Sequence, residues 1–291
     1  MAHAWAFTLD IDRLLNTVKR TDVSPLGAGA LAGSSLPLDP DFTAHEMGFA
    51  DRFSNSLDAV SDRDFVAEAL FDLALIGTHL SRMGEEWVLW TSEEFGFATL
   101  DDRYATGSSM LPQKKNADIA ELARGKAGRL IGNLTGLLTT LKGLPLAYNR
   151  DLQEDKEPLF DSYDQVCLAV SALTGMITTA TFNADRMRAA ADVQSLAATD
   201  LAEYLVRKGM PFRQAHAVVG ALVQQALSGS QSLQQLIATS PDFDADAQQL
   251  IGSGVGVQLR SSPGAAGPQA AQDQRTRFAL VIASLRTSLA I

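Results

Sequence analysis

The stretch from Ala105 to Leu122, ATGSSMLPQKKNADIAEL, gathers the residue types that an anion-binding or catalytic loop needs. Gly107 permits unusual backbone angles, and the hydroxyl groups of Ser108 and Ser109 follow it directly. Successive backbone N–H groups in such a loop can form an anion-binding nest. The residues that follow read as a helix, whose N-terminal end carries free N–H donors and partial positive charge. The stretch therefore predicts an anion-binding loop at the start of a helix.

The local charge favours an anionic small ligand. The whole chain has a formal net charge of −10, which argues against nucleic acid or an anionic membrane as its main partner. Between Gln113 and Arg129, however, five lysines and arginines stand against two acidic residues. We predict a carboxylate-bearing ligand here, and the alternative is a solvated basic turn.

Other catalytic and metal-binding patterns are missing from the sequence. It contains no Gly-x-Ser-x-Gly elbow, P-loop, Cys-x-x-Cys pair or His-Glu-x-x-His helix. Packed or surface roles fit the four widely spaced histidines better than metal binding: His3, His45, His79 and His216. No metal or other cofactor is therefore expected.

The single cysteine and the N-terminus favour a cytoplasmic protein. Cys167 lies in the apolar run VCLAVSAL and is expected to be a buried small hydrophobic residue. One cysteine cannot form a disulfide within the chain, which suits a reducing cytoplasm. The first residues lack the pattern of a signal peptide, and no window of about 18 residues is apolar enough to span a membrane.

Long helices must position the loop, and few strands are expected. Apolar residues recur at three- and four-residue steps in several long segments, which predicts an all-α bundle of long helices. Ser61 or Asp62 is expected to cap the helix predicted over residues 61–95. Gly143 and Pro145 are expected to end the helix predicted over residues 117–142. A Gly-, Ala- and Pro-rich loop is predicted over residues 21–41. The predicted long helices cover residues 2–20, 61–95, 117–142 and 159–182.

A glycine stripe marks the third of these helices. Gly125, Gly128, Gly132 and Gly136 follow one another at steps of three, four and four, so they share one helix face. Each costs about 0.5–1 kcal/mol relative to alanine in a helix interior. Close packing of this face against another helix would offset that cost.

The pattern changes near Asn183, where we predict a domain boundary. Residues 1–183 would form a central long-helix bundle domain and residues 184–291 a smaller C-terminal helical domain. In the second part, helices are expected over residues 190–210, 211–227 and 275–291, and a glycine-rich loop over 253–274.

The segment GSSMLPQKKN, Gly107 to Asn116, resembles the signature loop of the fumarase/aspartase superfamily, Gly-Ser-Ser-x-Met-Pro-x-Lys-x-Asn-Pro. Its Gln-Lys-Lys form is similar to the argininosuccinate lyase family, with its relative δ-crystallin. Adenylosuccinate lyase, fumarase and aspartase fit this form less well. Four further segments resemble the family, so the resemblance covers nearly the whole chain: residues 24–39, 54–68, 144–162 and 210–216.

The resemblance implies the reversible β-elimination of argininosuccinate to L-arginine and fumarate, a step in arginine biosynthesis. A base removes a proton beside a carboxylate, and the charge spreads into that carboxylate before the C–N bond breaks. Such chemistry needs a strong base and dense stabilisation of a developing dianion. By resemblance Ser108 would be the base, and Ser109 is the second candidate. A serine needs a stabilised alkoxide for this role.

The resemblance also implies substrate contacts and an assembly. Lys114 and Asn116 would hold the substrate carboxylates, and Glu121 would orient a histidine. The family forms homotetramers whose active sites combine segments from three subunits, and it uses no cofactor. A second binding segment would contribute Tyr148, Arg150 and Gln153.

Some positions depart from the family pattern. Met110-Leu111 reverses the usual order, Ala117 replaces a proline, and Arg150 stands where many members have lysine. The largest departure is the missing Thr-His-x-Gln-x-Ala-Gln-Pro segment, which carries the family's active-site histidine.

Three functions therefore stay open. The chain resembles the C-terminal three-fifths of a lyase, and the 291-residue chain alone is expected to have negligible activity. The alternatives are an inactive fragment or crystallin-like oligomerisation partner, and another superfamily lyase such as adenylosuccinate lyase.

Overall fold

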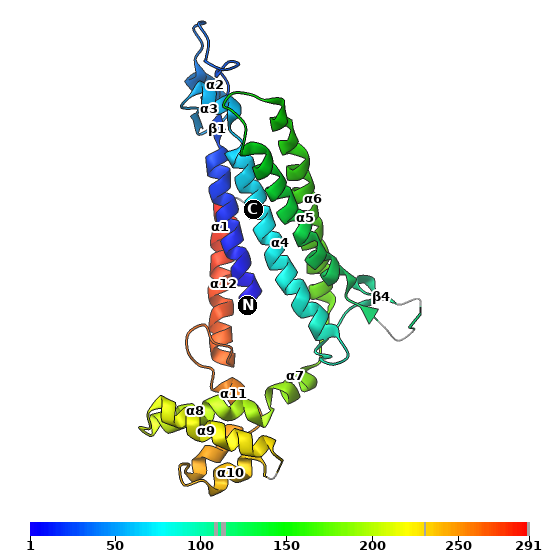
Figure 1. Ribbon diagram of the computed structural model, residues 1–291, viewed down its shortest axis with the longest axis vertical. Coiled ribbons are helices and arrows are strands. Elements are labelled where there is room, and N and C mark those ends of the chain that lie inside the picture. The colour runs from blue at the N-terminus through cyan, green and yellow to red at the C-terminus, as the bar shows by residue number, and fades with distance from the viewer. Residues whose placement is uncertain (108–109, 112–114, 230, 290–291) are drawn as a thin grey trace. The chain divides into compact units, whose positions relative to one another are not determined.

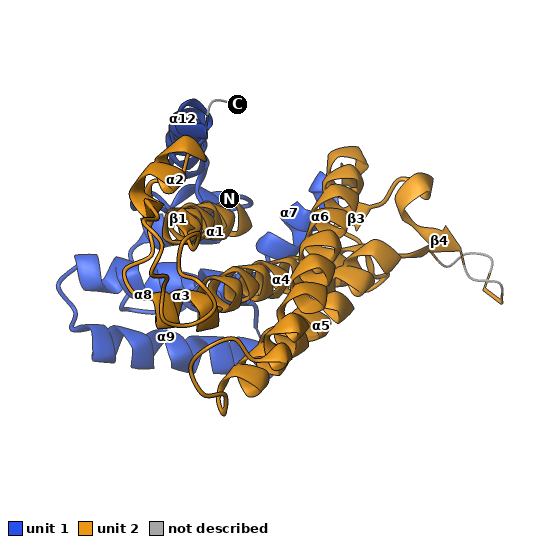
Figure 2. Cartoon of the chain, turned by 90° about the horizontal axis from the view of Figure 1, so that it is seen from above, with its two compact units in different colours: residues 1, 183–291 blue, residues 2–182 orange. Residues whose placement is uncertain are grey.

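Helices dominate the computed structural model, which describes residues 1–107, 110–111, 115–229 and 231–289 (Figure 1). The predicted all-α class is therefore confirmed. Strands are limited to three pairs of two residues each within the described residues. Contacts divide the chain into two compact units, residues 2–182 and residues 183–291 (Figure 2).

Four long helices build the first unit. α4 packs against α1, α5 and α6, and α5 also packs against α6. At 1.5 Å per residue, α4 is about 42 Å long and α5 and α6 about 36 Å each. The predicted helices are confirmed, although α4 begins three residues after and ends four residues before its expected bounds, and α6 begins and ends three residues before its own. The helices are α1 (Ala2–Thr21), α4 (Asp64–Thr91), α5 (Asp118–Leu141) and α6 (Lys156–Thr179).

The bundle core follows the apolar periodicity of α4. Leu73, Leu80 and Trp87 are spaced seven residues apart, and each is less than 10% exposed. They pack against α5 residues such as Ala120 and against Leu173 of α6. Burying a side chain of this size stabilises the fold by about 1.5–3 kcal/mol. The amphipathic pattern therefore sets which face of each helix points inward.

The closest helix contact in the bundle uses two glycines of α4. A Cβ atom added to Gly84 would lie 2.5 Å from the carbonyl oxygen of Ala120. A Cβ atom on Gly77 would overlap the Leu130 side chain. At Gly84 a larger residue would have to push the α5 backbone away, whereas at Gly77 the flexible Leu130 side chain would have to shift. Glycine therefore permits the contact, most strictly at Gly84.

The predicted glycine stripe of α5 makes no such contact within the chain. Added Cβ atoms at Gly125, Gly128, Gly132 and Gly136 would have no described atom within 4 Å. The buried residues of α5, including Ala123, Ala127 and Leu130, lie on the other side of the helix. The expected close packing of the stripe is therefore not made by this copy of the chain.

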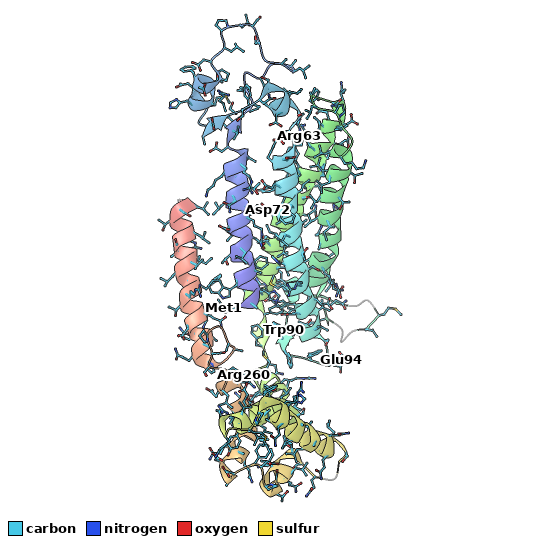
Figure 3. All side chains as sticks on the ribbon, turned by 60° about the vertical axis from the view of Figure 1, so that its left-hand side comes forward. Met1, Arg63, Asp72, Trp90, Glu94 and Arg260 are labelled. Atoms are coloured by element: carbon cyan, nitrogen blue, oxygen red, sulfur yellow. The ribbon has the colours of Figure 1, made fainter. Side chains whose placement is uncertain are left out.

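A polar layer lies inside the apolar contact between α1 and α4. Asp10 of α1 accepts a hydrogen bond from Arg13 at 2.9 Å and lies 2.6 Å from Nδ1 of His79. Thr17 donates to the buried carboxylate of Asp72 at 2.6 Å. Figure 3 labels Asp72 on α4, facing α1. His79 is thus a packed histidine, as its position in mid-helix suggested.

One end of the first unit consists of short elements. The predicted loop over residues 21–41 is confirmed as turns, apart from its short ends in α1, a two-residue strand and α2. The expected cap of α4 by Ser61 or Asp62 is wrong, because Arg63 is the N-cap and makes no side-chain capping hydrogen bond. Ser61 ends α3, and Asp62 accepts from the backbone N–H of Asp64 from one residue before the cap. The short elements here are β1 (Val23–Ser24), α2 (Pro40–Glu46), β2 (Asp51–Arg52), α3 (Ser56–Ser61) and η2 (Arg150–Asp155).

The opposite end of the bundle carries two small antiparallel ladders. β3 (Ala98–Thr99) pairs with β6 (Thr181–Phe182). β4 (Thr106–Gly107) pairs with β5 (Lys115–Asn116) and follows the single-turn helix η1 (Asp102–Tyr104). The second ladder holds the signature loop.

The prediction for Cys167 is wrong, because this residue is exposed on α6. The inward face of α6 carries Val166, Ala169 and Leu173. Cys167 follows Val166, and one residue turns the helix by about 100°, which carries the thiol off the packed face.

The second unit has its own apolar core, which includes Leu201, Leu205, Val219 and Ile237. The helix predicted over residues 190–210 is broken by a turn and η3 before α8 begins. The loop predicted over 253–274 is also partly wrong, because it contains the short helix α11 and because the last helix begins at Pro268. Proline fits the first turn of a helix and the next residues are good helix formers. The elements are α7 (Ala184–Ala191), η3 (Gln194–Ala197), α8 (Ala198–Arg207), α9 (Phe212–Leu227), α10 (Leu233–Thr239), η4 (Ala245–Ile251), α11 (Val255–Gln258) and α12 (Pro268–Leu289).

Candidate functional site

The signature loop is held by a β hairpin that projects from the bundle (Figure 1). Thr106 pairs with Asn116, and Gly107 with Lys115. The predicted base Ser108, its neighbour Ser109 and the predicted carboxylate ligand Lys114 lie outside the described residues. Asn116 is half-buried at the end of β5, and α5 begins two residues later. The expected order of loop and helix is therefore confirmed.

Side chains on both strands anchor the hairpin. The Thr106 hydroxyl donates a hydrogen bond to the carboxylate of Asp118, the first residue of α5. The Lys115 ammonium pairs with Asp102 of η1. The local sequence pattern did not mark Thr106, Asp118 or Asp102 as anchors of the hairpin. The available signal for Asp118 was its position as an acidic residue at the start of the predicted helix, with the polar Thr106 before the loop.

An exposed ion pair lies directly before the hairpin. The guanidinium of Arg103 donates to both carboxylate oxygens of Asp101, at 3.0 Å from Nε and 2.9 Å from Nη2. These hydrogen bonds, with that of the Arg103 backbone, lower the pKa of Asp101 to about 2. Asp101 also caps η1 and helps to fix the chain that leads into β4.

Ion pairs neutralise much of the local positive charge that the sequence suggested. Arg124 pairs with Glu85 of α4, and Arg129 pairs with Asp161 of α6. The hydrogen bond from Arg129 is the main reason that the pKa of Asp161 lies below its usual value. With Lys115 on Asp102, three of the five cations have acidic partners. The described part of this region therefore offers less free charge to a ligand than expected.

The predicted second binding segment follows α5. Tyr148 precedes η2, and Arg150 and Gln153 lie within it. The Gln153 amide donates to the Tyr148 hydroxyl, and all three side chains are exposed. Ala147 has a φ of 84°, an unusual value for a residue with a side chain. Periodicity could not predict this turn, which leads into Tyr148 and η2.

Two of the other segments that resemble the family, residues 24–39 and 54–68, lie beside this one. Arg63 donates from Nε to Asp155 at 2.6 Å, with side chains only 15% and 8% exposed. A cavity of about 580 Å³ lies against this pair, and its walls include Ser24, Phe53 and Lys156. Arg63 is labelled at this end of α4 in Figure 3. Residues 24–39, 54–68 and 144–162 thus come together, although they are far apart in sequence.

The hairpin and the second binding segment lie at opposite ends of α5 (Figure 1). One precedes Asp118 and the other follows Leu141, so the length of the helix, about 36 Å, separates them. Glu121 is exposed near the hairpin end. A substrate of metabolite size cannot touch both segments of one copy. The structure therefore does not bring Asn116 and Tyr148 into a single site within the chain.

The described residues contain neither a metal-binding cluster nor a membrane-spanning helix. No group of three or more His, Cys, Asp or Glu side chains among them could hold a metal ion. Within the same residues, no helix is both long and apolar enough to cross a membrane.

Comparison with known proteins identifies two family profiles in the chain. Residues 1–132 match the family described as Lyase, and residues 195–253 match the family described as Argininosuccinate lyase C-terminal. The first match includes the hairpin and the start of α5. The second includes α8, α9 and α10.

Curated relatives carry one enzyme name. The chain is 56% identical to the argininosuccinate lyase of Frankia casuarinae, across 94% of this chain and 60% of the relative. It is 52% identical to that of Moorella thermoacetica, across 99% of this chain and 63% of the relative. The chain thus spans about three-fifths of the length of the curated relatives that it matches.

Solved structures share the architecture. An EDDS lyase in complex with formate matches with a TM-score of 0.87 and 30% identity, over 97% of this chain and 59% of that one. A 3-carboxy-cis,cis-muconate lactonizing enzyme from Pseudomonas putida matches with a TM-score of 0.71 and 20% identity, over 97% of this chain and 62% of that one. The second match concerns the fold alone.

Proposed function

Because the chain belongs to the argininosuccinate lyase family, we propose that it contributes to the reversible β-elimination of argininosuccinate to L-arginine and fumarate. The observation that carries the proposal is the hairpin, which presents the family's signature segment at the N-terminal end of α5. Identity above 50% to two lyases, over nearly the whole chain, supports the same substrate.

In this proposal the residues have separate tasks. Ser108 is the base that removes the substrate proton, and Ser109 is the alternative. Lys114 and Asn116 bind the substrate carboxylates, while Tyr148, Arg150 and Gln153 contact the remainder of the substrate. Glu121 orients a histidine from another part of the assembly.

We further propose that the active site is shared between copies in a homotetramer. The separation of about 36 Å between the two segments supports this, because another copy must supply whichever segment is missing at each end. The exposed glycine face of α5 offers a surface for close packing of a second copy. We also infer a cytoplasmic location, from the single cysteine and the family.

The absorbance of fumarate in the ultraviolet tests the proposal directly. The 291-residue chain and the same chain extended with the N-terminal region of the Frankia casuarinae enzyme would be compared. We expect turnover of argininosuccinate by the extended protein and negligible turnover by the chain alone, since the histidine segment is supplied only in the extension. Adenylosuccinate, malate and aspartate are the substrate controls.

The outcomes separate the candidate functions. Preference of the extended protein for adenylosuccinate would assign the chain to another lyase of the superfamily. An assembled but inactive extended protein would favour the crystallin-like oligomerisation partner, for which the exposed glycine face is the specific support. Full turnover by the chain alone would contradict the need for the missing segment.

A further inference from the structure

Arg63 stands at the N-cap of α4 but gives that helix no side-chain hydrogen bond. Its guanidinium instead reaches across to the segment before α6. Nε donates to Oδ2 of Asp155 at 2.6 Å, and Nη1 donates to the backbone carbonyl of Asp62 at 2.5 Å. The bond to the carbonyl fixes the direction of the guanidinium, so that Nε is already aimed at Asp155.

Asp155 is the point at which this contact holds the second binding segment. It ends η2, and its other oxygen, Oδ1, accepts a hydrogen bond from Lys156 at 2.9 Å. Leu152, also in η2, is 3% exposed. In the part of the chain that the structure describes, the bond from Arg63 is the only side-chain hydrogen bond that joins residues 145–156 to the rest. Arg63 is therefore the polar tether of this segment.

The tether acts at one end of the helix that carries predicted substrate contacts. Arg150 begins η2 and Gln153 lies within it, linked by its amide to the Tyr148 hydroxyl. Arg63 also lines, with Ala147 of the preceding turn, a cavity of about 270 Å³. Hydrogen bonds in a 3₁₀ helix have poorer geometry than those in an α-helix. The position of η2 therefore depends strongly on contacts at its ends.

We propose that Arg63 is a positioning residue for the second binding segment. Through Asp155 it fixes η2, and η2 presents the predicted contacts to the arginine part of the substrate. This inference rests on the proposed lyase function, in which the carboxylates are assigned to Lys114 and Asn116. Arg63 contacts neither of the two strands of the hairpin that carries them, so its loss should weaken the binding of arginine and leave that of fumarate unchanged.

The reverse reaction separates these two effects. The N-terminally extended enzyme would be assayed with arginine and fumarate varied in turn, by the loss of fumarate absorbance. We expect Arg63→Gln to raise the KM for arginine about tenfold or more, since misplaced hydrogen-bonding groups are lost to that substrate. The KM for fumarate should stay within about twofold of the unsubstituted value. A purely structural role would reduce the amount of active enzyme and leave both KM values as they are.

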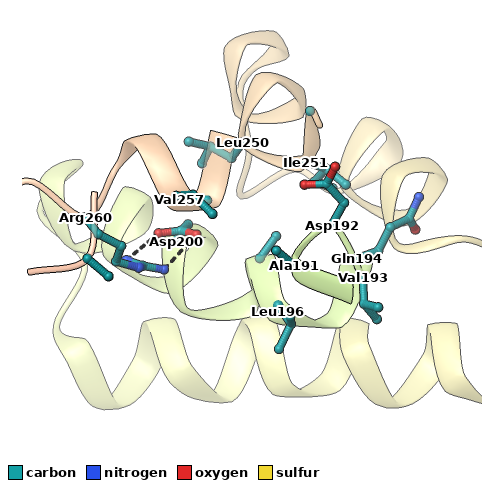
Figure 4. A pocket seen from close by; sticks show the side chains of 14 residues that line it. Ala191, Asp192, Val193, Gln194, Leu196, Asp200, Leu250, Ile251, Val257 and Arg260 are labelled. Carbon is teal, nitrogen blue, oxygen red and sulfur yellow. Dashed lines mark hydrogen bonds and ion pairs between the residues drawn. The ribbon is translucent and has the colours of Figure 1, made fainter. Parts of the chain in front are cut away.

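Two further arginines serve as matched controls. Arg20 lines the same cavity of about 580 Å³ as Arg63, but it pairs with Glu68 and not with η2. Arg260 forms an ion pair with Asp200, which is 1% exposed, inside the second unit (Figure 4). Arg20→Gln tests the loss of a cation from the cavity wall, and Arg260→Gln tests the loss of a buried ion pair. Both variants should keep the KM for arginine.

A double variant and hydrogen exchange test the route through Asp155. Adding Asp155→Asn to Arg63→Gln should raise the KM for arginine no further, because both substitutions break one contact. Hydrogen exchange needs no activity and can use the 291-residue chain. Arg63→Gln should speed the exchange of residues 148–155 and leave that of α9 unchanged.

The inference is overturned if the KM values for arginine and fumarate rise together, or if the KM for arginine does not change. It is equally overturned if Arg20→Gln matches the effect of Arg63→Gln, or if exchange over residues 148–155 stays the same. Absence of turnover by the unsubstituted extended enzyme would instead contradict the proposed function, and the exchange measurement would still decide whether Arg63 holds the segment. Should Arg63→Gln fail to fold, Arg63→Lys takes its place, because lysine keeps the charge but cannot make both hydrogen bonds.

Discussion

Asp72 carries a buried carboxylate into the contact between α1 and α4. It is 3% exposed, and burial raises its pKa above the ordinary value of 3.8 despite the hydrogen bond from Thr17. A raised pKa means that the folded state holds this proton more tightly than the unfolded state. The contribution of Asp72 to stability therefore falls as the pH rises through this range.

Replacing Asp72 by asparagine tests how much the burial of the ionised carboxylate destabilises the fold. The amide oxygen can still accept from Thr17, while the desolvated charge is gone. We expect Asp72→Asn to raise the thermal unfolding midpoint at pH 7, by an amount that shrinks as the pH approaches 4. Asp164→Asn, an exposed position on α6, is the control. A gain that does not vary with pH would contradict the role of ionisation.

The pair of Arg63 and Asp155 joins the start of α4 to the segment before α6. Because both side chains are largely buried, removing one partner leaves an uncompensated charge. Asp155→Asn should lower the free energy of unfolding by about 3 kcal/mol, measured by urea denaturation. The exposed pair of Arg188 and Asp185 is the comparison, and Arg188→Gln should have little effect. Equal losses in both variants would show that burial is not the cause.

Substitution of Ser108 tests the proposed role of this residue as the catalytic base. In the N-terminally extended enzyme, loss of the base should lower kcat about 10²- to 10⁴-fold without changing the oligomeric state. Steady-state assays of Ser108→Ala and Ser109→Ala, with sedimentation of both, provide the measurement. A larger loss in Ser109→Ala would transfer the role of base to that residue.

At the scale of elements, the contact between α4 and α5 depends on glycine. Gly84→Ala would place a Cβ atom 2.5 Å from a backbone oxygen, which cannot move away as a flexible side chain could. We expect a loss of about 1–3 kcal/mol in the free energy of unfolding, from denaturant titration. Gly220→Ala, also inside a helix but unobstructed, should instead gain up to about 1 kcal/mol. A gain in both variants would refute the close contact.

Local patterns predicted the helices better than their contacts. Apolar spacing identified α1, α4 and α5 closely, because that spacing is the direct signature of a helix with one buried face. It misjudged Cys167, since an apolar run does not reveal which of its residues faces inward. It also emphasised the regular glycines of α5, whereas Gly77 and Gly84 of α4 make the close contact. Which glycine meets a neighbour depends on the partner helix.

At the scale of the whole molecule, the separation of the two binding segments makes a prediction about assembly. Suppose that Asn116→Ala and Gln153→Ala each inactivate the extended enzyme. Mixed oligomers should then recover activity, because some shared sites receive an intact hairpin from one copy and an intact second segment from another. Co-expression followed by the fumarate assay measures this. Activity no higher than that of either variant alone would indicate that the two segments do not need to meet.

The sequence by itself determined the all-α class, the long helices and the family, because periodicity and the signature segment are local properties of the chain. It also indicated which residues to examine for chemistry. Only the tertiary structure decided that three of the five local cations are paired and that residues 24–39, 54–68 and 144–162 meet around the pair of Arg63 and Asp155. It also revealed the ion pair of Asp200 and Arg260 beside a cavity. These features depend on contacts between residues far apart in sequence, which packing alone establishes.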